Sequence, residues 1–248
     1  MKSFHKLLCL ACVLMLSACG GGNSQQQAEQ SAKNKAATQN EQTDDHDHSD
    51  AAHRKQAQTA RQVAVQNQVG PGDYVKDFSL LNLEGSKTSL SDYEDAKGVI
   101  LIFSCNHCPY VKASEERMIE LHEQMAPKGY PVVAVNSNDT TGGNDADSYQ
   151  NMKKRAEEKG FPFAYLRDHS QKVARRFGAE KTPHVFLLER DDKGYRVAYV
   201  GAIDDNVMKP EKVKVNYVKQ AIQSLEKGQE PDPQTTKAIG CSMKYKEV

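Results

Sequence analysis

Apolar positions divide the chain into a leader, a polar stretch and a folded part. Residues 7–16 form an uninterrupted apolar run of ten residues, too short to span a bilayer but long enough for a signal-peptide core. From residue 20 to about residue 68, large apolar side chains are almost absent before Val63, so this stretch cannot bury enough surface to fold. We therefore expect a signal peptide at 1–18, a linker at 19–68, a folded domain at 69–228 and a tail at 229–248 that packs on or near the domain.

The folded part alternates between predicted strands and helices. Val99 to Phe103 are five apolar residues without alternation, a pattern typical of an interior strand covered on both faces. After Pro109, buried-type positions recur at steps of three and four up to Met125, which predicts an amphipathic helix. Further strands are expected at 77–81, 87–90, 131–136, 185–188 and 196–200, and further helices at 146–159, 170–177 and 211–227.

Two cysteines lie where the predicted interior strand meets this helix, in Cys105-Asn106-His107-Cys108. A helix that begins at Cys105 points its unpaired N–H groups and the positive end of its dipole at that sulfur, which favours thiolate over thiol. Cys108 lies within one turn and can release a mixed disulfide. The spacing therefore predicts Cys105 as the nucleophile and Cys108 as the resolving thiol.

The start of the chain predicts an envelope location. Lys2 and Lys6 precede the apolar run, and Leu16-Ser17-Ala18-Cys19 resembles a bacterial lipobox, which implies cleavage before Cys19 and lipidation of its thiol. Gly20 in place of Asp favours the outer over the inner membrane by resemblance to lipoprotein sorting rules. We expect a lipid-anchored domain that faces the periplasm or the exterior. Histidines and aspartates at 44–53 in the linker either take up a metal ion or form a solvated segment.

The number of cysteines restricts their use. Of the six, Cys9 and Cys12 leave with the signal peptide and Cys19 carries lipid, so Cys105, Cys108 and Cys241 remain as thiols. This is too few for a disulfide scaffold, and the dithiol is present for chemistry. Cys241 lies in the tail, where it is a third redox thiol or, as we favour, an inert one. Lysines plus arginines and aspartates plus glutamates both total 33, so nothing indicates a nucleic-acid partner.

The order of elements, with a dithiol after the first central strand, resembles the thioredoxin fold. Thr182-Pro183 precedes a strand where thioredoxin-like proteins place a cis proline against the dithiol. An added hairpin, an excursion at 137–149 and the segments CNHCPYVK, VNSND, Gly201–Asp205 and Gly240–Lys244 resemble the redoxin, or peroxiredoxin-like (AhpC/TSA-related), group. The resemblance implies an α/β fold with a central mixed sheet flanked by helices. Residues implied to shape the site are Asn106, His107, Thr182, Pro183 and His184; Asp204 and Asp205 are implied without a role.

The same resemblance argues against a peroxidase. Peroxiredoxins carry a proline and a threonine at fixed positions before the peroxidatic cysteine, and those positions hold Gly98 and Ile102 before Cys105, and Leu101 and Cys105 before Cys108. We therefore expect a thiol-disulfide oxidoreductase that needs no cofactor beyond its own disulfide and acts on protein thiols or disulfides with an envelope redox partner. His107 favours an oxidant, whereas the buried acid that deprotonates the second cysteine of thioredoxin is replaced by Val99. The direction of exchange stays open.

A copper-handling alternative uses overlapping residues. Sco-type proteins place two cysteines and one histidine at this corner of the same fold, and Cys105, Cys108 and His184 offer the thiolates and the imidazole that suit copper. Sco proteins, however, separate their cysteines by three residues rather than two. This alternative makes His184 a metal ligand instead of a residue beside the site.

Overall fold

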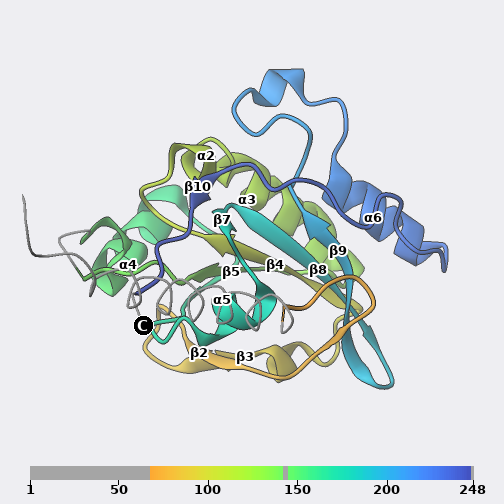
Figure 1. Cartoon of the computed structure of the whole chain (residues 1–248), viewed down its shortest axis with the longest axis horizontal. Helices are drawn as coiled ribbons and strands as arrows, with labels where there is room; N and C mark the ends of the chain where they lie inside the picture. The colour runs from red at the N-terminus through yellow and green to blue at the C-terminus, as the bar shows by residue number, and fades with distance from the viewer. Residues whose placement is uncertain (1–67, 142–144, 247–248) are drawn as a thin grey trace, which may run out of the picture. The chain divides into compact units, whose positions relative to one another are not determined.

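The computed structural model describes residues 68–141 and 145–246. The predicted signal peptide, Cys19, nearly all of the linker and its histidine cluster lie outside these residues. In the described part, β1 (Tyr74–Val75), β2 (Ser79–Leu81), β3 (Lys87–Ser89), β4 (Gly98–Ser104), β5 (Val132–Asn136), β6 (Ala164–Arg167), β8 (His184–Asp191) and β9 (Gly194–Gly201) form one sheet. Its strand order is β1-β9-β8-β4-β5-β6-β2-β3 (Figure 1). A separate two-stranded sheet joins β7 (Lys181–Thr182) to β10 (Cys241–Ser242).

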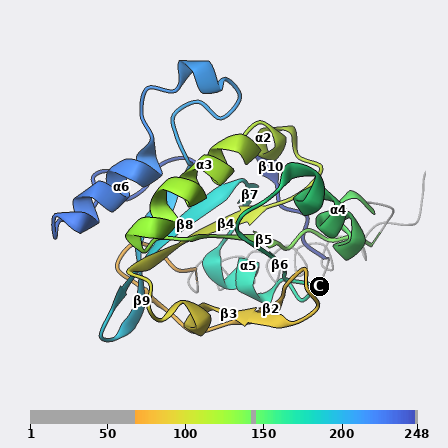
Figure 2. The same cartoon turned by 180° about the vertical axis from the view of Figure 1, so that it is seen from behind.

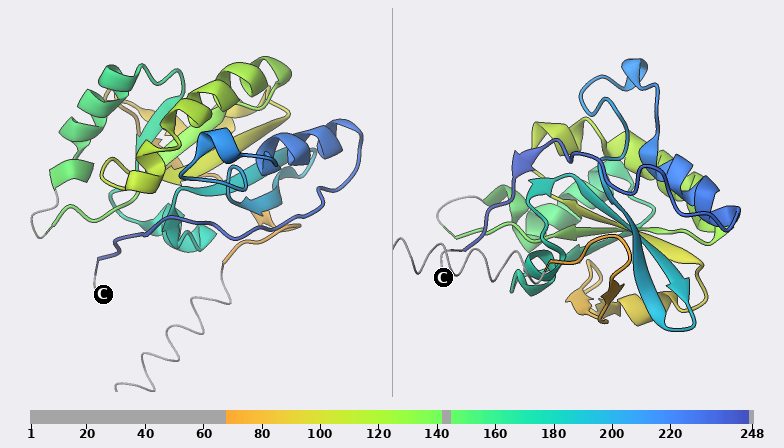
Figure 3. Two further views of the ribbon diagram at one scale, coloured as in Figure 1. Left: turned by 90° about the horizontal axis from the view of Figure 1, so that it is seen from above. Right: turned by 45° about the vertical axis from the view of Figure 1, so that its right-hand side comes forward.

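Helices cover both faces of the large sheet. They are α2 (Pro109–Lys112), α3 (Glu115–Met125), α4 (Tyr149–Lys159), α5 (Lys172–Phe177) and α6 (Tyr217–Glu226). Helices α3 and α6 lie on one face and α5 on the other, as the opposite and tilted views show (Figures 2 and 3). No helix within 68–141 or 145–246 has the length and apolar character of a membrane span.

Strand β4 lies at the centre because both of its faces are apolar. All seven of its residues are buried. Ile100 and Ile102 point into the core beneath α3 and α6, while Leu101 and Phe103 point into the core beneath α5. This division follows from the two-residue period of a strand, and it confirms the interior strand predicted from the uninterrupted apolar run.

The central strands have the thioredoxin arrangement. Strand β4 runs parallel to β5 and antiparallel to β8, and β8 forms a hairpin with β9 before α6 closes the unit. A strand-helix-strand unit followed by a hairpin and a helix is the order expected for this α/β fold. Ser79 pairs with Ser89 in the predicted N-terminal hairpin, whose second strand ends at a short 3-10 helix.

Several predicted boundaries were wrong for local reasons. The helix predicted up to Met125 is divided at Ala113–Ser114, where the Ser114 hydroxyl donates to the carbonyl of Tyr110 over 2.8 Å. Helix α4 begins at Tyr149 because Ser148 caps it, and α6 begins at Tyr217 because Asn216 caps it. Strand β6 was missed altogether. It is a four-residue strand after a helix, without the alternation that marks a half-buried strand.

Candidate active site

The two cysteines flank a bend at the end of β4 and the start of α2. The helix begins at Pro109 with Cys108 as its N-cap, so the prediction that it starts at Cys105 was wrong. Proline is favoured at the first helical position, because its missing N–H has no partner there in any helix. The cap therefore falls on Cys108, and the free N–H groups of the first turn lie nearest to that sulfur rather than to Cys105.

Thr182 contacts both sulfurs from the opposite side. Its hydroxyl lies 3.2 Å from the Cys105 sulfur, and its carbonyl oxygen lies 3.2 Å from the Cys108 sulfur. The peptide bond between Thr182 and Pro183 is cis, as predicted. Cys105 and Cys108 are free thiols with exposures of 1% and 0%, so the dithiol is held between the start of α2 and the proline loop, out of contact with solvent.

The two thiols differ strongly in acidity. The pKa of Cys108 is lowered to about 4, chiefly by a hydrogen bond with the Cys105 thiol, against the opposing effect of burial; the Val111 amide also favours the thiolate. The pKa of Cys105 is raised by that same hydrogen bond, by burial and by the charge of Asp147. In the reduced site, the two thiols therefore titrate as a pair, and Cys108 is the more acidic of the two.

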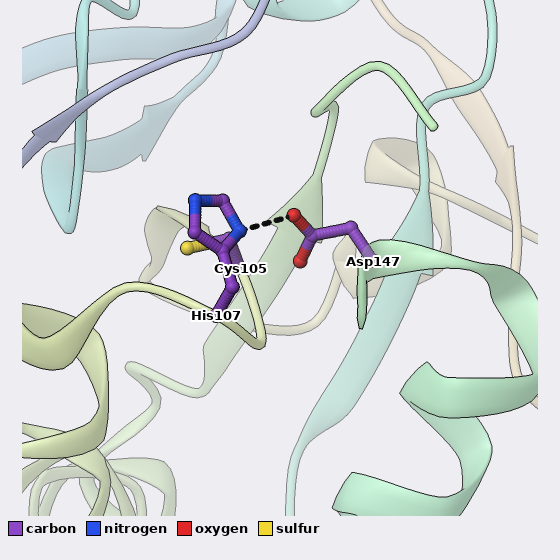
Figure 4. A group of neighbouring side chains, drawn as sticks. All are labelled: Cys105, His107 and Asp147. Carbon is purple, nitrogen blue, oxygen red and sulfur yellow. Dashed lines mark hydrogen bonds and ion pairs between the residues drawn. The ribbon is translucent and has the colours of Figure 1, made fainter. Parts of the chain in front are cut away.

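A buried carboxylate completes the site. Asp147, in the 3-10 turn Asp145–Asp147, is fully buried, and its carboxylate lies 2.5 Å from Nδ1 of His107 (Figure 4). The Cys105 sulfur, an imidazole nitrogen of His107 and a carboxylate oxygen of Asp147 all lie within 4.8 Å of one another. Nδ1 of the ring faces the carboxylate, so Asp147 orients the imidazole. Cysteine, histidine and aspartate thus lie together, as they do in sites that activate a nucleophile.

Other polar groups hold Asp147 in place. The backbone N–H of Asn106 donates to it over 2.6 Å, and the side-chain amides of Asn136 and Asn138 donate over 3.1 and 3.2 Å. Tyr165 in turn donates to the side-chain oxygen of Asn106 over 2.9 Å. These donors supply the hydrogen bonds that a carboxylate needs when it lies out of water.

Asp147 could not be recognised from the sequence. The position that matches the buried acid of thioredoxin holds Val99, an apolar core residue of β4. The buried carboxylate of this site comes from the excursion at 137–149, forty residues after His107 in the chain. The length of that excursion and its run of asparagines and aspartates were the available signals, but nothing in a linear sequence indicates which of its carboxylates folds back onto His107.

His184 does not join the two thiols in a ligand set. Among the described residues, the group that could hold a metal ion is Cys105, His107 and Asp147. His184 pairs with Phe103 across the β4–β8 ladder, and its ring lies 4.8 Å from that of Phe186. Burial lowers its pKa to about 4, so the ring is neutral near pH 7. The set Cys105, Cys108 and His184 proposed for copper is therefore not the one that the fold brings together.

The remaining candidate residues are Asp204, Asp205 and Cys241, and the two aspartates have structural roles. Asp204 forms an ion pair with Arg117 of α3, and Asp205 accepts a hydrogen bond from the backbone N–H of Lys214 over 2.9 Å. Both aspartates therefore hold the loop before α6. Cys241 packs against the dithiol from the tail.

Comparison with known proteins supports the fold. The model of the AhpC/TSA family matches residues 71–205. A conserved protein of Geobacillus kaustophilus is 35% identical, with a TM-score of 0.64 over 73% of this chain and 95% of that chain. A protein of Sinorhizobium meliloti is 28% identical, with a TM-score of 0.65 over 73% of this chain and 97% of that chain.

Among curated proteins, the thiol-disulfide oxidoreductase ResA of Bacillus anthracis is 27% identical over 122 residues. The match takes in 49% of this chain and 65% of the length of that relative.

Proposed function

The chain belongs to the AhpC/TSA family, and we propose that within it this protein is a thiol-disulfide oxidoreductase that uses Cys105 and Cys108. The observation that carries the proposal is the placement of both thiols between the start of α2 and the Thr182–Pro183 loop, with unequal acidities. Thiol-disulfide exchange needs one sulfur that bonds to the substrate. It also needs a second sulfur that is the leaving group in one direction and resolves the mixed disulfide in the other.

Cys105 is the sulfur that bonds to the substrate. It lies beside His107, whose side chain is 28% exposed, whereas Cys108 is enclosed by Val111 and Cys241. When a substrate thiolate attacks the Cys105 sulfur of the oxidised pair, the Cys105–Cys108 bond breaks and its electrons leave on Cys108. A sulfur of low pKa leaves fastest, and the start of α2 stabilises the charge that develops there.

His107 and Asp147 handle the proton of Cys105. In the reverse reaction, Cys105 must lose its proton before it attacks a substrate disulfide, and the His107 imidazole, with a ring nitrogen within 4.8 Å of the Cys105 sulfur, is the base that accepts it. Asp147 orients the ring through Nδ1 and stabilises the imidazolium that forms. Cys108, the more acidic of the two thiols, then resolves the mixed disulfide.

The stabilised Cys108 thiolate also favours the reduced form of the pair. A redox couple whose reduced form is stabilised is a stronger oxidant, so we place its potential above the thioredoxin value of about −270 mV. Titration against glutathione measures it. A value below that of thioredoxin would contradict this assignment.

We further propose that the domain works in the cell envelope, outside the cytoplasm. The support is the basic leader with its short apolar run and the lipobox-like residues up to Cys19, together with Gly20, which favours the outer membrane. Labelled palmitate should enter the protein and not its Cys19→Ser variant. Equal labelling of both would contradict lipidation at Cys19.

Substrates can be identified by trapping. In a Cys108→Ser variant, the mixed disulfide at Cys105 cannot be resolved by Cys108, so protein partners should accumulate as adducts in envelope extracts. The Cys105→Ser/Cys108→Ser double variant is the matched control and should trap far less. Absence of adducts that depend on Cys105 would contradict protein disulfide exchange.

A further inference from the structure

The C-terminal tail returns to the active site as a strand. Strand β10 pairs antiparallel with β7, which places Cys241 opposite Thr182, the residue that contacts both active-site sulfurs. Figure 1 shows β10 beside β7 and α2, far from α6, where the tail begins. The tail therefore crosses the molecule and ends against the dithiol.

The tail is closely fitted at this place. A side chain at Gly240 would bring its Cβ within 2.1 Å of the Thr182 carbonyl oxygen, so only glycine allows this approach of the two backbones. On the other side of Cys241, the backbone N–H of Met243 donates to the carbonyl of Glu180 over 2.9 Å. The backbone N–H of Lys244 donates to Asn138, whose amide also donates to Asp147. The position of Cys241 is thus fixed from both sides by contacts with the site.

Three free thiols meet as a result. Cys241 packs against the cluster of Cys105, Cys108 and Val111, and it is half-buried where the other two thiols are fully buried. Cys241 lowers the pKa of Cys108, while burial and its interaction with Cys108 raise the pKa of Cys241 to about 11. The packing thus places the Cys241 thiol beside Cys108, as a thiol-disulfide exchange between the two residues needs.

We propose that Cys241 is a third redox thiol of the site, which exchanges with Cys108 and thereby moves the disulfide from the Cys105 side to the tail. The inference deepens the proposed function and rests on it. Cys241 loses its proton to solvent and its sulfur attacks Cys108 in the oxidised pair. The Cys108–Cys241 bond forms, the Cys105–Cys108 bond breaks, and Cys105 leaves with the electron pair and takes up a proton. One disulfide is present before and after, so no oxidant or reductant is consumed.

The exchange lets the site react with partners at two places. Cys105 lies beside the partly exposed His107, whereas Cys241 is itself partly exposed on the tail. A partner that exchanges at Cys241 can therefore oxidise or reduce the Cys105–Cys108 pair through Cys108. Cys105 then stays available to the substrate.

The test isolates the two sulfurs of the new bond. The full-length Cys105→Ser variant is equilibrated with glutathione buffers, its remaining thiols are blocked, and its disulfide-linked peptides are mapped. We expect the Cys108–Cys241 bond. We also expect its equilibrium constant against glutathione to fall by at least about tenfold when Gly240→Val is added, because the valine displaces the strand and lowers the effective concentration of Cys241.

Gly70→Val is the matched control, since a Cβ at Gly70 meets nothing closer than 4.0 Å. It should leave the equilibrium unchanged. Cys105→Ala provides a second background if the serine variant folds poorly.

Two outcomes overturn the inference: no Cys108–Cys241 bond in buffers that oxidise the wild-type pair, or the same equilibrium constant with and without Gly240→Val. If the wild-type protein exchanges disulfides with substrates but either outcome occurs, the inference alone fails. If the Cys108–Cys241 bond forms but the wild-type protein exchanges no disulfide with any thiol substrate, the proposed function fails instead.

Discussion

The central strands and the C-terminal tail meet at the same two sulfurs but are built differently. Every residue of β4 is buried, and its side chains pack into cores on both faces of the sheet. Between residues 229 and 246, only Pro231 and Met243 are buried, and the tail is attached by hydrogen bonds of its backbone and of side chains such as Thr236 and Tyr245, and by its fit at Gly240. The central strands therefore determine where the sulfurs lie, whereas the tail determines what can reach them. Stability and reactivity should then be separable by mutation.

The largest effect is expected in the central strands. Ile102→Ala removes a fully buried side chain beneath α3 and α6, and should lower the free energy of unfolding by roughly 2–5 kcal/mol. Urea denaturation measures this change. Leu81→Ala, at a position 37% exposed, is the control and should change it by less than about 1 kcal/mol. Equal losses in both variants would show that β4 is not the stabilising centre.

The next largest effect concerns the transfer of the Cys105 proton, which depends on His107 after β4 and on Asp147 from the excursion at 137–149. Asp147→Asn keeps the size of the side chain but removes the charge that orients and stabilises protonated His107, so the rate of disulfide exchange should fall by roughly a hundredfold. Stopped-flow reaction with a model disulfide at pH 7 measures the rate. Asp145→Asn changes an exposed carboxylate in the same 3-10 turn and should leave it unaltered. A similar decrease in both variants would argue against a specific role for Asp147.

Displacing the tail should have a smaller effect of a different kind. Gly240→Val should raise the rate at which iodoacetamide alkylates Cys108 by about tenfold, since local opening then costs less, with little loss of global stability. Mass-spectrometric mapping of labelled peptides gives the rate, with Gly70→Val for comparison. Unchanged labelling would mean that the tail does not restrict access to Cys108.

The smallest effect is a pH slope. With the pKa of Cys108 at about 4 and that of Cys105 raised, reduction of the pair near neutral pH takes up two electrons and one proton. The midpoint potential should therefore fall by about 30 mV per pH unit, and not by the roughly 59 mV of a pair that takes up two protons. Redox titrations between about pH 6 and pH 8 measure the slope. The steeper slope would show that Cys108 is a neutral thiol.

Much of the fold could be predicted from the sequence where the signal is local. The apolar run of β4 and the Thr182–Pro183 step depend on neighbouring residues and were predicted correctly. Helix boundaries were less accurate, because a cap such as Ser148 or a proline such as Pro109 moves them by several residues. Strand β6 was not predicted because its four residues do not alternate between buried and exposed positions.

Only those site residues that are close together in the sequence could be predicted. Cys105, Cys108 and His107 lie within four residues of one another, and their proximity follows from the chain. Asp147 and Cys241 reach the site through long-range folding, by a hydrogen bond to His107 and by strand pairing with Thr182. No composition or spacing rule indicates such contacts. The acidity of the dithiol depends on them as well, since Cys241 lowers the pKa of Cys108 and Asp147 raises that of Cys105.

The assignment of the two active-site sulfurs is the central claim, and adduct mapping tests it most directly. Cys108→Ser/Cys241→Ser and Cys105→Ser/Cys241→Ser proteins are each incubated with glutathione disulfide at pH 7, and the adducts are located by peptide mass spectrometry. We predict that Cys105 in the first variant forms the mixed disulfide at least about tenfold faster than Cys108 in the second, because it lies beside His107, the base that accepts its proton. Faster adduct formation on Cys108 would contradict the account.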